Sequence, residues 1–437
     1  MKSRLLTAIA ALCLCVPGVF VTGSANMAAS TADWPQWRGP KRDGVSNESG
    51  LLKQWPAGGP KLLWQVNDIG DGYSTPSVVG TRIYLMSNIG MENEFVQALS
   101  TQDGKPVWTT RVGNVGNPNQ NPPYPKARST PTVDGNFIYA LGSDGDLACL
   151  DAKTGKIRWQ KNIRKEFGGQ PGEWAYAESP LIDGDVLVVT PGGAEATIVA
   201  LNKKTGAGIW KSAVPGGDPA GYASAIVVQA AGRKQYVQFL SKCLVGVDAK
   251  TGQFLWRYKE AAKGPAQYFT PVARGEYVYG GALGVGGGLV RLKPGLKSEG
   301  GGVAAEQVYF ERGLPNGLGG AVLVGETIYG TDIAPGPLVA AEFATGKVKW
   351  KAESIGRVAI AYADGLLYLH GVDGDVALVE ASPEAYREIS RFSPPNQPKH
   401  KQVGIYPEQA YAHPVIANGR LYIRDLGTLW VYDIKNK

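Results

Sequence analysis

Cysteine and histidine are scarce in this sequence. Of the 437 residues, four are cysteines, and only Cys149 and Cys243 lie outside the first 25 residues. No Cys-x-x-Cys-His motif is present, which excludes covalently attached haem of the c type. The three histidines, His370, His400 and His413, do not stand at metal-ligand spacing, so the sequence predicts no metal centre.

Charged residues and segments with helical periodicity are scarce as well. Charged residues make up 19% of the chain, and no cluster of Lys and Arg with interleaved aromatic residues occurs, so we expect no nucleic-acid partner. No segment after residue 30 shows sustained helical periodicity, whereas 59 glycines and 29 prolines are typical of a loop-rich, all-β chain. We expect a monomer.

Only one long apolar run occurs, and it lies at the start of the sequence. Lys2 and Arg4 precede an apolar stretch over residues 5–21, and the small residues 23–25 follow it. This order is typical of a secretory signal peptide. We therefore predict a signal peptide over 1–25, an N-terminal extension over 26–58 and one domain over 59–437. The protein is expected to be exported, periplasmic or secreted, without a transmembrane segment.

A repeated phrase dominates the rest of the chain. It consists of an acidic or polar residue, three spacers, Gly, three spacers and Trp, as in Asp151–Trp159 and Asp248–Trp256. Asp at the start and Gly four residues later are typical of a tight turn, and apolar strands flank each turn. We expect each Trp at the end of a phrase to wedge between neighbouring sheets. The predicted docking residues are Trp64, Trp108, Trp159, Trp210, Trp256 and Trp350.

A second pattern precedes each phrase and gives the number of repeats. A proline or its equivalent, a turn residue and a β-rich pair recur at fixed offsets, starting at Pro76 and ending at Pro414, in eight units. Each unit supplies four strands, which predicts an all-β, eight-bladed β-propeller of four-stranded antiparallel blades. The strand around Trp64 has no hairpin of its own, and we expect it to close the ring by completing the last blade. A seven-bladed ring is the alternative.

The phrase Asp-Ala-x-Thr-Gly-x-x-x-Trp resembles the tryptophan-docking repeat of the pyrroloquinoline quinone propellers. It also resembles the exported, non-enzymatic propeller of outer-membrane β-barrel assembly. The resemblance covers residues 34–437 and implies the fold. Membership of the enzyme group would imply pyrroloquinoline quinone with calcium, but the adjacent cysteine pair typical of its alcohol dehydrogenases is missing from residues 26–437.

The repeat also predicts where a site would lie. Loops that lead into the inner strands of a propeller surround one mouth of its channel, and concave, loop-built mouths are usual ligand sites. The loops over 114–126, 166–176 and 393–408 are longer than a two-to-five-residue turn, which favours a binding role. The candidate mouth residues are Tyr73, Arg128, Trp174, Glu178, Tyr222, Tyr268, Arg357, Tyr411 and His413. The alternative is that these side chains pack between blades or bind loop carbonyls.

Two functions follow from these observations. The first is an exported binding or scaffold propeller that engages a protein, peptide or envelope polymer through its mouth and loops. The second is a quinone-dependent dehydrogenase of alcohols or sugars, in which Arg128 and Arg357 would supply cations, Trp174 a stacking face and Glu178 a metal ligand or base. The missing cysteine pair and haem motif favour the first.

Overall fold

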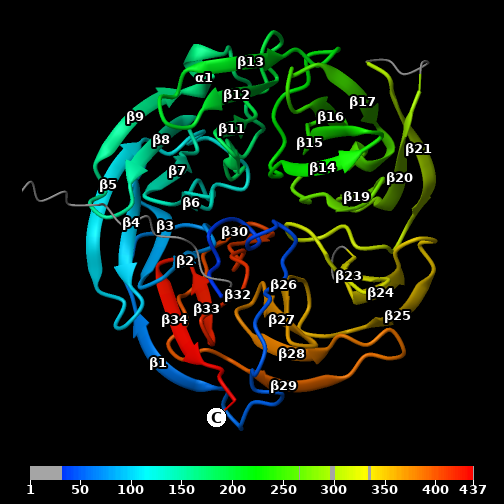
Figure 1. Ribbon diagram of the computed structural model, residues 1–437. Helices are drawn as coiled ribbons and strands as arrows, with labels where there is room; N and C mark the ends of the chain where they lie inside the picture. Colours follow the sequence, from blue (N-terminus) through cyan, green and yellow to red (C-terminus); the bar gives the residue numbers. More distant parts are fainter. Residues whose placement is uncertain (1–31, 265, 296–300, 333–335, 437) are drawn as a thin grey trace, which may run out of the picture.

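The protein is a ring of eight four-stranded antiparallel sheets around a central axis (Figure 1). The computed structural model describes residues 32–264, 266–295, 301–332 and 336–436, so the predicted signal peptide lies outside the described residues. Besides strands, the described residues contain one short α-helix, α1 (Ile163–Glu166), and one 3-10 helix, η1 (Glu260–Ala262). The predicted eight-bladed, all-β propeller is confirmed, and the seven-bladed alternative is wrong.

Seven blades use four consecutive strands each, numbered here from the N-terminus. Blade 1 contains β2 (Ser77–Val79), β3 (Arg82–Ile89), β4 (Asn93–Ser100) and β5 (Pro106–Gly113). Blade 2 contains β6 (Thr132–Asp134), β7 (Phe137–Leu141), β8 (Asp146–Asp151) and β9 (Ile157–Asn162). Blade 3 contains β10 (Leu181–Asp183), β11 (Val186–Val189), β12 (Ile198–Asn202) and β13 (Gly208–Ser212). Blade 4 contains β14 (Ile226–Ala230), β15 (Arg233–Phe239), β16 (Leu244–Asp248) and β17 (Phe254–Tyr258).

The second half of the ring repeats this order. Blade 5 contains β18 (Val272–Arg274), β19 (Tyr277–Ala282), β20 (Gly286–Pro294) and β21 (Val303–Glu311). Blade 6 contains β22 (Val322–Val324), β23 (Thr327–Thr331), β24 (Leu338–Glu342) and β25 (Val348–Ala352). Blade 7 contains β26 (Val358–Ala363), β27 (Leu366–Gly371), β28 (Val376–Glu380) and β29 (Glu388–Phe392). A two-stranded hairpin, β30 (Gln402–Val403) and β31 (Tyr406–Pro407), lies between blades 7 and 8.

Blade 8 joins the two ends of the propeller. It contains β32 (Val415–Ala417), β33 (Arg420–Asp425) and β34 (Thr428–Asp433), and its outer strand is β1 (Lys61–Val66) from the start of the ring. In the antiparallel pairing of β1 with β34, Trp64 lies opposite Val431. The predicted closure by the strand around Trp64 is therefore confirmed. Pairing β34 with β1 removes an open sheet edge.

The repeated turn explains how adjacent blades fit together. Thr154 donates its backbone N–H to Asp151 Oδ1 at 2.9 Å, and Gly155 has a φ of 72°, in the left-handed region that favours glycine. A Cβ on Gly155 would lie 2.5 Å from the Trp108 ring of the preceding blade. Trp108 Nε1 also donates to Ala152 O of this turn at 3.2 Å. Gly155 therefore allows the tight turn and leaves room for the Trp108 indole.

Most of the predicted docking tryptophans repeat this contact. The donors Trp64, Trp159, Trp210 and Trp350 reach the acceptors Thr101, Lys203, Ala249 and Ser382 of the next blade. Trp256 differs, because its Nε1 donates to Gln235 Oε1 within blade 4 at 2.7 Å. Its ring still belongs to the apolar cluster between blades 4 and 5. The link between β20 and β21 has no Asp-x-x-x-Gly phrase on which Trp256 could dock.

Candidate functional site

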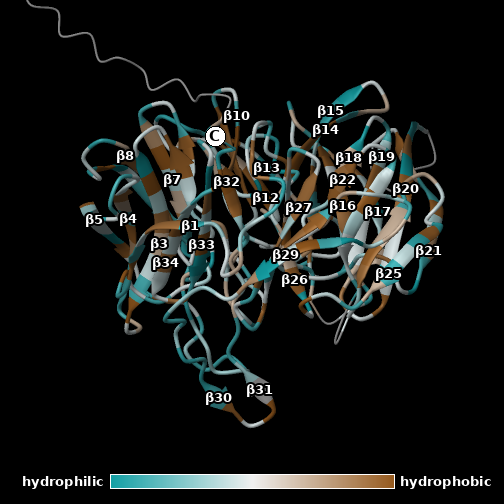
Figure 2. Cartoon of the chain, turned by 90° about the horizontal axis from the view of Figure 1, so that it is seen from below, coloured by the Kyte–Doolittle hydropathy of each residue, from teal (hydrophilic) through white to brown (hydrophobic). Residues whose placement is uncertain are grey.

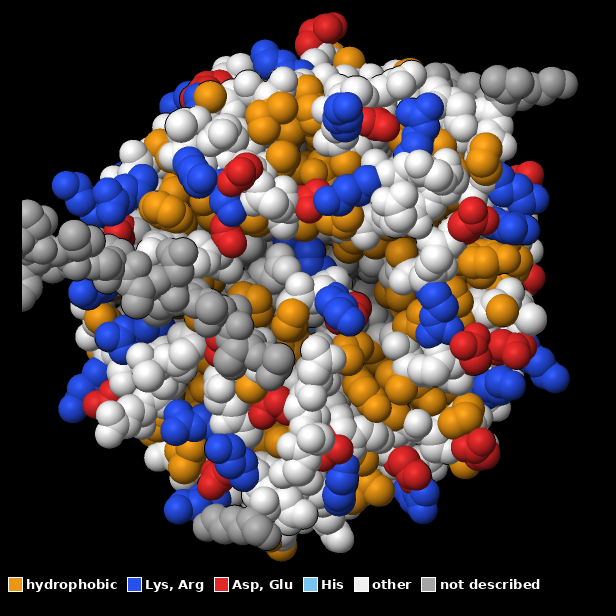
Figure 3. Space-filling model, viewed as in Figure 1, with side chains coloured by type: hydrophobic (Ala, Val, Ile, Leu, Met, Phe, Trp, Pro, Cys, Tyr) orange, Lys and Arg blue, Asp and Glu red, His pale blue; other side chains and the backbone are white. Residues whose placement is uncertain are grey.

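One end of the central channel is occupied by the N-terminal segment 33–46, which we call the plug (Figure 1). Trp34 pairs with Val78 of blade 1, and Pro35 O accepts from Val133 N of blade 2. Farther along the plug, Val45 bridges Tyr362 of blade 7. Figure 3 views the ring from the face at which the plug enters, where positive and negative side chains are interspersed. The plug thus ties together blades 1, 2 and 7.

Two buried arginines fix the plug to the starts of the inner strands. Arg38 donates to Ala321 O of blade 6 at 2.5 Å, while Arg42 donates to Ser179 O at 2.6 Å and to Pro180 O of blade 3 at 3.0 Å. Both side chains are almost fully buried, and burial lowers the pKa of each to about 10. Both remain charged at neutral pH and act as multiple hydrogen-bond donors to backbone carbonyls.

Glu178 and His413, predicted at the mouth, lie against the plug instead. Glu178 is 3% exposed and accepts from Gln238 Nε2 at 2.8 Å and from the backbone of Thr190. Burial raises the pKa of Glu178 to about 7, and the nearby Arg42 opposes that rise. The His413 ring meets the Trp37 ring edge-on at 4.8 Å, and burial, with Arg38 nearby, lowers the pKa of His413 to about 3.

At the other end of the channel, the remaining predicted residues come together. Arg128 lies 5.2 Å above the Tyr73 ring, and Tyr411 packs edge-on against the same ring at 5.1 Å between centroids. Burial lowers the pKa of Arg128, and Tyr73, Tyr411 and Tyr222 oppose that change electrostatically. The four residues therefore share one environment at the mouth.

The other half of the mouth contains the second predicted arginine. Arg357 donates to Gln409 Oε1 at 2.6 Å, and Tyr411 Oη donates to the same oxygen at 3.1 Å. Burial raises the pKa of Tyr268, with Arg357 and Tyr411 as the nearby charges that modify it. Tyr222 accepts from Trp174 N at 3.2 Å, and their rings lie 5.2 Å apart. We call Tyr73, Arg128, Tyr222, Tyr268, Arg357 and Tyr411 the mouth ring.

The three long loops form one continuous rim beside the mouth ring. Trp174 Nε1 donates to Asn121 O at 2.8 Å, which joins the loop before blade 3 to the loop before blade 2. Tyr124 Oη donates to Lys401 O at 3.3 Å, which joins the latter to the loop before blade 8. A solvent-open pocket of about 740 Å³ lies between the first two loops, with Glu92, Asp144, Arg164 and Glu173 among its lining residues.

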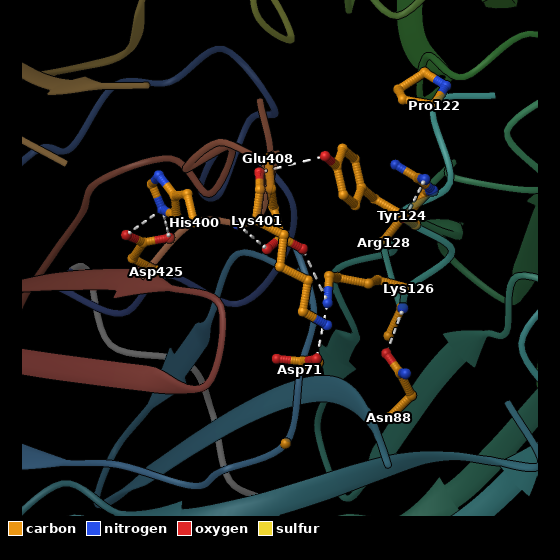
Figure 4. A network of polar contacts seen from close by, with 12 residues as sticks. Asp71, Asn88, Pro122, Tyr124, Lys126, Arg128, His400, Lys401, Glu408 and Asp425 are labelled. Carbon is orange, nitrogen blue, oxygen red and sulfur yellow. Dashed lines mark hydrogen bonds and ion pairs between the residues drawn. The ribbon is translucent and has the colours of Figure 1, made fainter. Parts of the chain in front are cut away.

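Residues 393–411 form a projecting arm that ends in the β30–β31 hairpin (Figure 2). Its base is fixed by a polar network that sequence reasoning missed (Figure 4). Lys126 Nζ lies 2.8 Å from Asp71 Oδ2 and 3.2 Å from Glu408 Oε1, and His400 Nε2 lies 2.9 Å from Asp425 Oδ2. These pairs join positions far apart in sequence, and no spacing signal marks them.

The part of the chain that the structure describes has no group of three or more His, Cys, Asp and Glu side chains that could hold a metal ion. Cys149 and Cys243 are buried, free thiols. None of the helices among these residues has the length and apolar character needed to cross a membrane.

Comparison with known proteins gives concordant matches. A family model described as outer membrane protein assembly factor BamB matches residues 45–173 and 92–282. The BamB of Moranella endobia is 27% identical over 125 residues, which cover 27% of this chain and 31% of the relative. This chain therefore spans about a third of the length of that curated relative.

Solved structures show the same fold at low identity. The crystal structure of BamB from Moraxella catarrhalis has a TM-score of 0.59 at 17% identity and covers 89% of this chain and 99% of its own. A quinohemoprotein alcohol dehydrogenase from Pseudomonas putida HK5 has a TM-score of 0.52 at 12% identity and covers 93% and 81%, respectively. At these identities, the likeness establishes the architecture and leaves the activity open.

Proposed function

Since this chain belongs to the family of outer membrane protein assembly factor BamB, we propose that it is an exported binding or scaffold propeller. It engages a protein, peptide or envelope polymer through the mouth ring and the three long loops. The observation that supports this proposal is the difference between the two ends of the channel. One end is occupied by the plug, whereas the other presents the mouth ring, the rim and the projecting arm.

The chemistry of the mouth ring supports a binding role. Arg128 and Arg357 make no ion pair among the described residues, and their donors are directed to neutral partners such as Tyr124 O and Gln409 Oε1. Both side chains are half-buried rather than fully enclosed. A guanidinium held on an aromatic ring is well suited to bind a carboxylate or another planar anion on a ligand. The ring therefore favours ligands that carry acidic groups.

The quinone-dependent dehydrogenase is the less favoured alternative, because the residues proposed for it do not converge. Glu178 was the predicted metal ligand or base, yet its carboxylate is buried, bonded to Gln238 and Thr190, and adjacent to Arg42 of the plug. Arg128 and Arg357 belong to the mouth ring. Glu178 is therefore already bonded within the protein and is not free to hold a calcium ion beside the mouth ring, so we derive no catalytic step through a quinone.

Site-specific photocrosslinking in cells that express the protein tests the proposal. A photoreactive phenylalanine analogue replaces Tyr222 or Tyr268 of the mouth ring, and Ile209, which is 49% exposed on the outer strand β13, serves as the control. We expect discrete adducts from the two mouth positions and none from position 209. Adducts from position 209 alone would contradict the proposal.

Calorimetry with pyrroloquinoline quinone and calcium tests the alternative independently. We expect no saturable binding of the quinone to the purified chain. Tight binding accompanied by dye-linked oxidation of an alcohol or sugar, both reduced by Glu178→Gln, would overturn the scaffold assignment in favour of the enzyme.

A further inference from the structure

The tip of the arm exposes aliphatic side chains to solvent. In the β30–β31 hairpin, Val403 lies opposite Tyr406, and Gly404 turns the chain with a φ of 58°. Ile405 is 83% exposed and Val403 is 46% exposed, so that Ile405 is the most exposed large hydrophobic residue among those described. Figure 2 shows the hairpin well beyond the rest of the ring, with hydrophobic residues at its end.

The base of the arm holds this tip away from the ring. Trp430 Nε1 of blade 8 donates to Pro395 O at 2.8 Å, and Ala410 N donates to Val372 O of blade 7 at 2.9 Å. The pairs of His400 with Asp425 and of Lys126 with Glu408 lie between these anchors (Figure 4). The arm is therefore fixed at both of its ends, and the aliphatic tip stays in solvent rather than folding back onto an apolar surface.

The exposed charges of the arm have one sign. Residues 393–407 contain no acidic residue, and Lys399 and Lys401 are exposed just before the tip. Glu408, which follows the hairpin, is buried and paired with Lys126, so it does not offset the two lysines at the surface. Two exposed lysines thus lie beside a small aliphatic tip.

We propose that the arm tip inserts into the interfacial region of an anionic lipid bilayer. Apolar side chains that enter the acyl boundary, together with lysines that remain among anionic headgroups, are the two features that attach proteins reversibly to such surfaces. The tip is too small to provide the roughly 800 Å² per partner of a standard protein–protein interface. Because it projects beyond the ring, it reaches a flat surface before the rest of the molecule.

Flotation with lipid vesicles tests the proposal on the purified chain from residue 26 onward, which contains every described residue. Vesicles of phosphatidylcholine with phosphatidylglycerol are compared with vesicles of phosphatidylcholine alone. We expect the anionic vesicles to carry the protein at low salt, and the fraction bound to fall as salt screens the lysines. Absence of binding to the anionic vesicles would overturn the proposal and would point to a protein partner for the tip.

Matched variants distinguish insertion of the tip from nonspecific adsorption of the protein to the vesicles. We expect the double variant Val403→Ser/Ile405→Ser to reduce partitioning at least about tenfold, because two aliphatic side chains no longer enter the lipid. Lys399→Gln/Lys401→Gln should reduce it several-fold and flatten its salt dependence. The control Ile209→Ser removes an exposed aliphatic residue from the outer strand β13 and should leave binding unchanged. Equal binding by the tip variant and the unsubstituted chain would contradict insertion.

A fluorescent probe gives a second, independent readout. Cys149 and Cys243 are buried, so an environment-sensitive dye can be directed to the cysteine of Ile405→Cys. We expect a blue shift of the dye emission on addition of anionic vesicles, and none when the same dye is attached through Ile209→Cys. A shift of equal size at both positions would contradict insertion at the tip.

Discussion

Each end of the channel has a pair of arginines, but the two pairs have different surroundings. Arg38 and Arg42 of the plug are buried and donate to the carbonyls of Ala321, Ser179 and Pro180. Arg128 and Arg357 of the mouth ring are half-buried among tyrosines. Arg38 and Arg42 are enclosed with their carbonyl acceptors and hold the structure together, whereas Arg128 and Arg357 are only half-buried at an open face and can reach a ligand.

The largest expected difference between the two ends concerns tryptophan. Trp34 of the plug is 1% exposed and lies in the apolar core of blades 1, 7 and 8, so Trp34→Ala should lower the free energy of unfolding by roughly 3–5 kcal/mol. Trp174 at the rim is half-buried, and Trp174→Ala should lower it by less than about 1 kcal/mol. Denaturant unfolding followed by circular dichroism measures both. Equal losses of unfolding free energy in the two variants would contradict the distinction between the two ends.

The arginines themselves give the next largest effect. Arg42→Ala leaves two buried carbonyls without their charged donor, which should cost roughly 2–5 kcal/mol of unfolding free energy. Arg128→Ala should cost less than about 1 kcal/mol, while it weakens photocrosslinking from the mouth ring. If Arg128→Ala destabilises the protein as much as Arg42→Ala, then Arg128 has a structural role, and its assignment as a ligand-binding cation is contradicted.

A pH experiment probes the carboxylate beneath the plug. Burial raises the pKa of Glu178 from 4.5 to about 7 in the folded protein, so the folded state binds more protons than the unfolded chain between these values. Stability therefore falls as the pH rises through this window, with a total cost of roughly 2–4 kcal/mol. Glu178→Gln should remove that fall. Thermal unfolding of both proteins across the window measures it, and identical pH profiles would contradict the raised pKa.

The smallest effect is expected at the base of the arm. The hydrogen bond to Asp425 raises the pKa of His400, so this pair stabilises the fold below the ordinary histidine pKa and loses its contribution as the pH rises through the folded value. His400→Gln should therefore destabilise the protein more in mildly acidic solution, where the pair is charged, than in alkaline solution. Hydrogen exchange of residues 393–411 at the two pH values provides the local readout, and protection that does not change with pH would contradict this role.

The ring was predictable from the sequence because its signals are local. The turn that holds Asp151 and Gly155 and the seat for Trp108 are encoded within a few residues and then repeated. The common placement of the mouth-ring residues follows from the repeat for a related reason. All six of its residues stand three positions before the proline-like residue of their repeat, so the symmetry of the fold brings them to the same height around the axis.

The two candidate residues that lie outside the mouth ring differ in their position within the repeat. Glu178 and His413 stand two and one positions before their prolines, where the chain has already entered the channel and meets the plug. The plug was not predictable, because residues 33–46 contain no repeat and their contacts extend to strands hundreds of residues away. The sequence shows that Arg38 and Arg42 are cations, but their acceptors are backbone carbonyls, which have no sequence signature.

The pairing of β1 with β34 sets the order in which this protein can be completed. Because Trp64 lies opposite Val431, the first strand of the ring must remain without its partner until nearly the entire chain has been synthesised. Intermediate blades can form as they emerge, but an exposed strand edge persists at each end of the growing arc. A ribosome that stalls late would therefore leave a nearly complete propeller that is open to pairing with another chain.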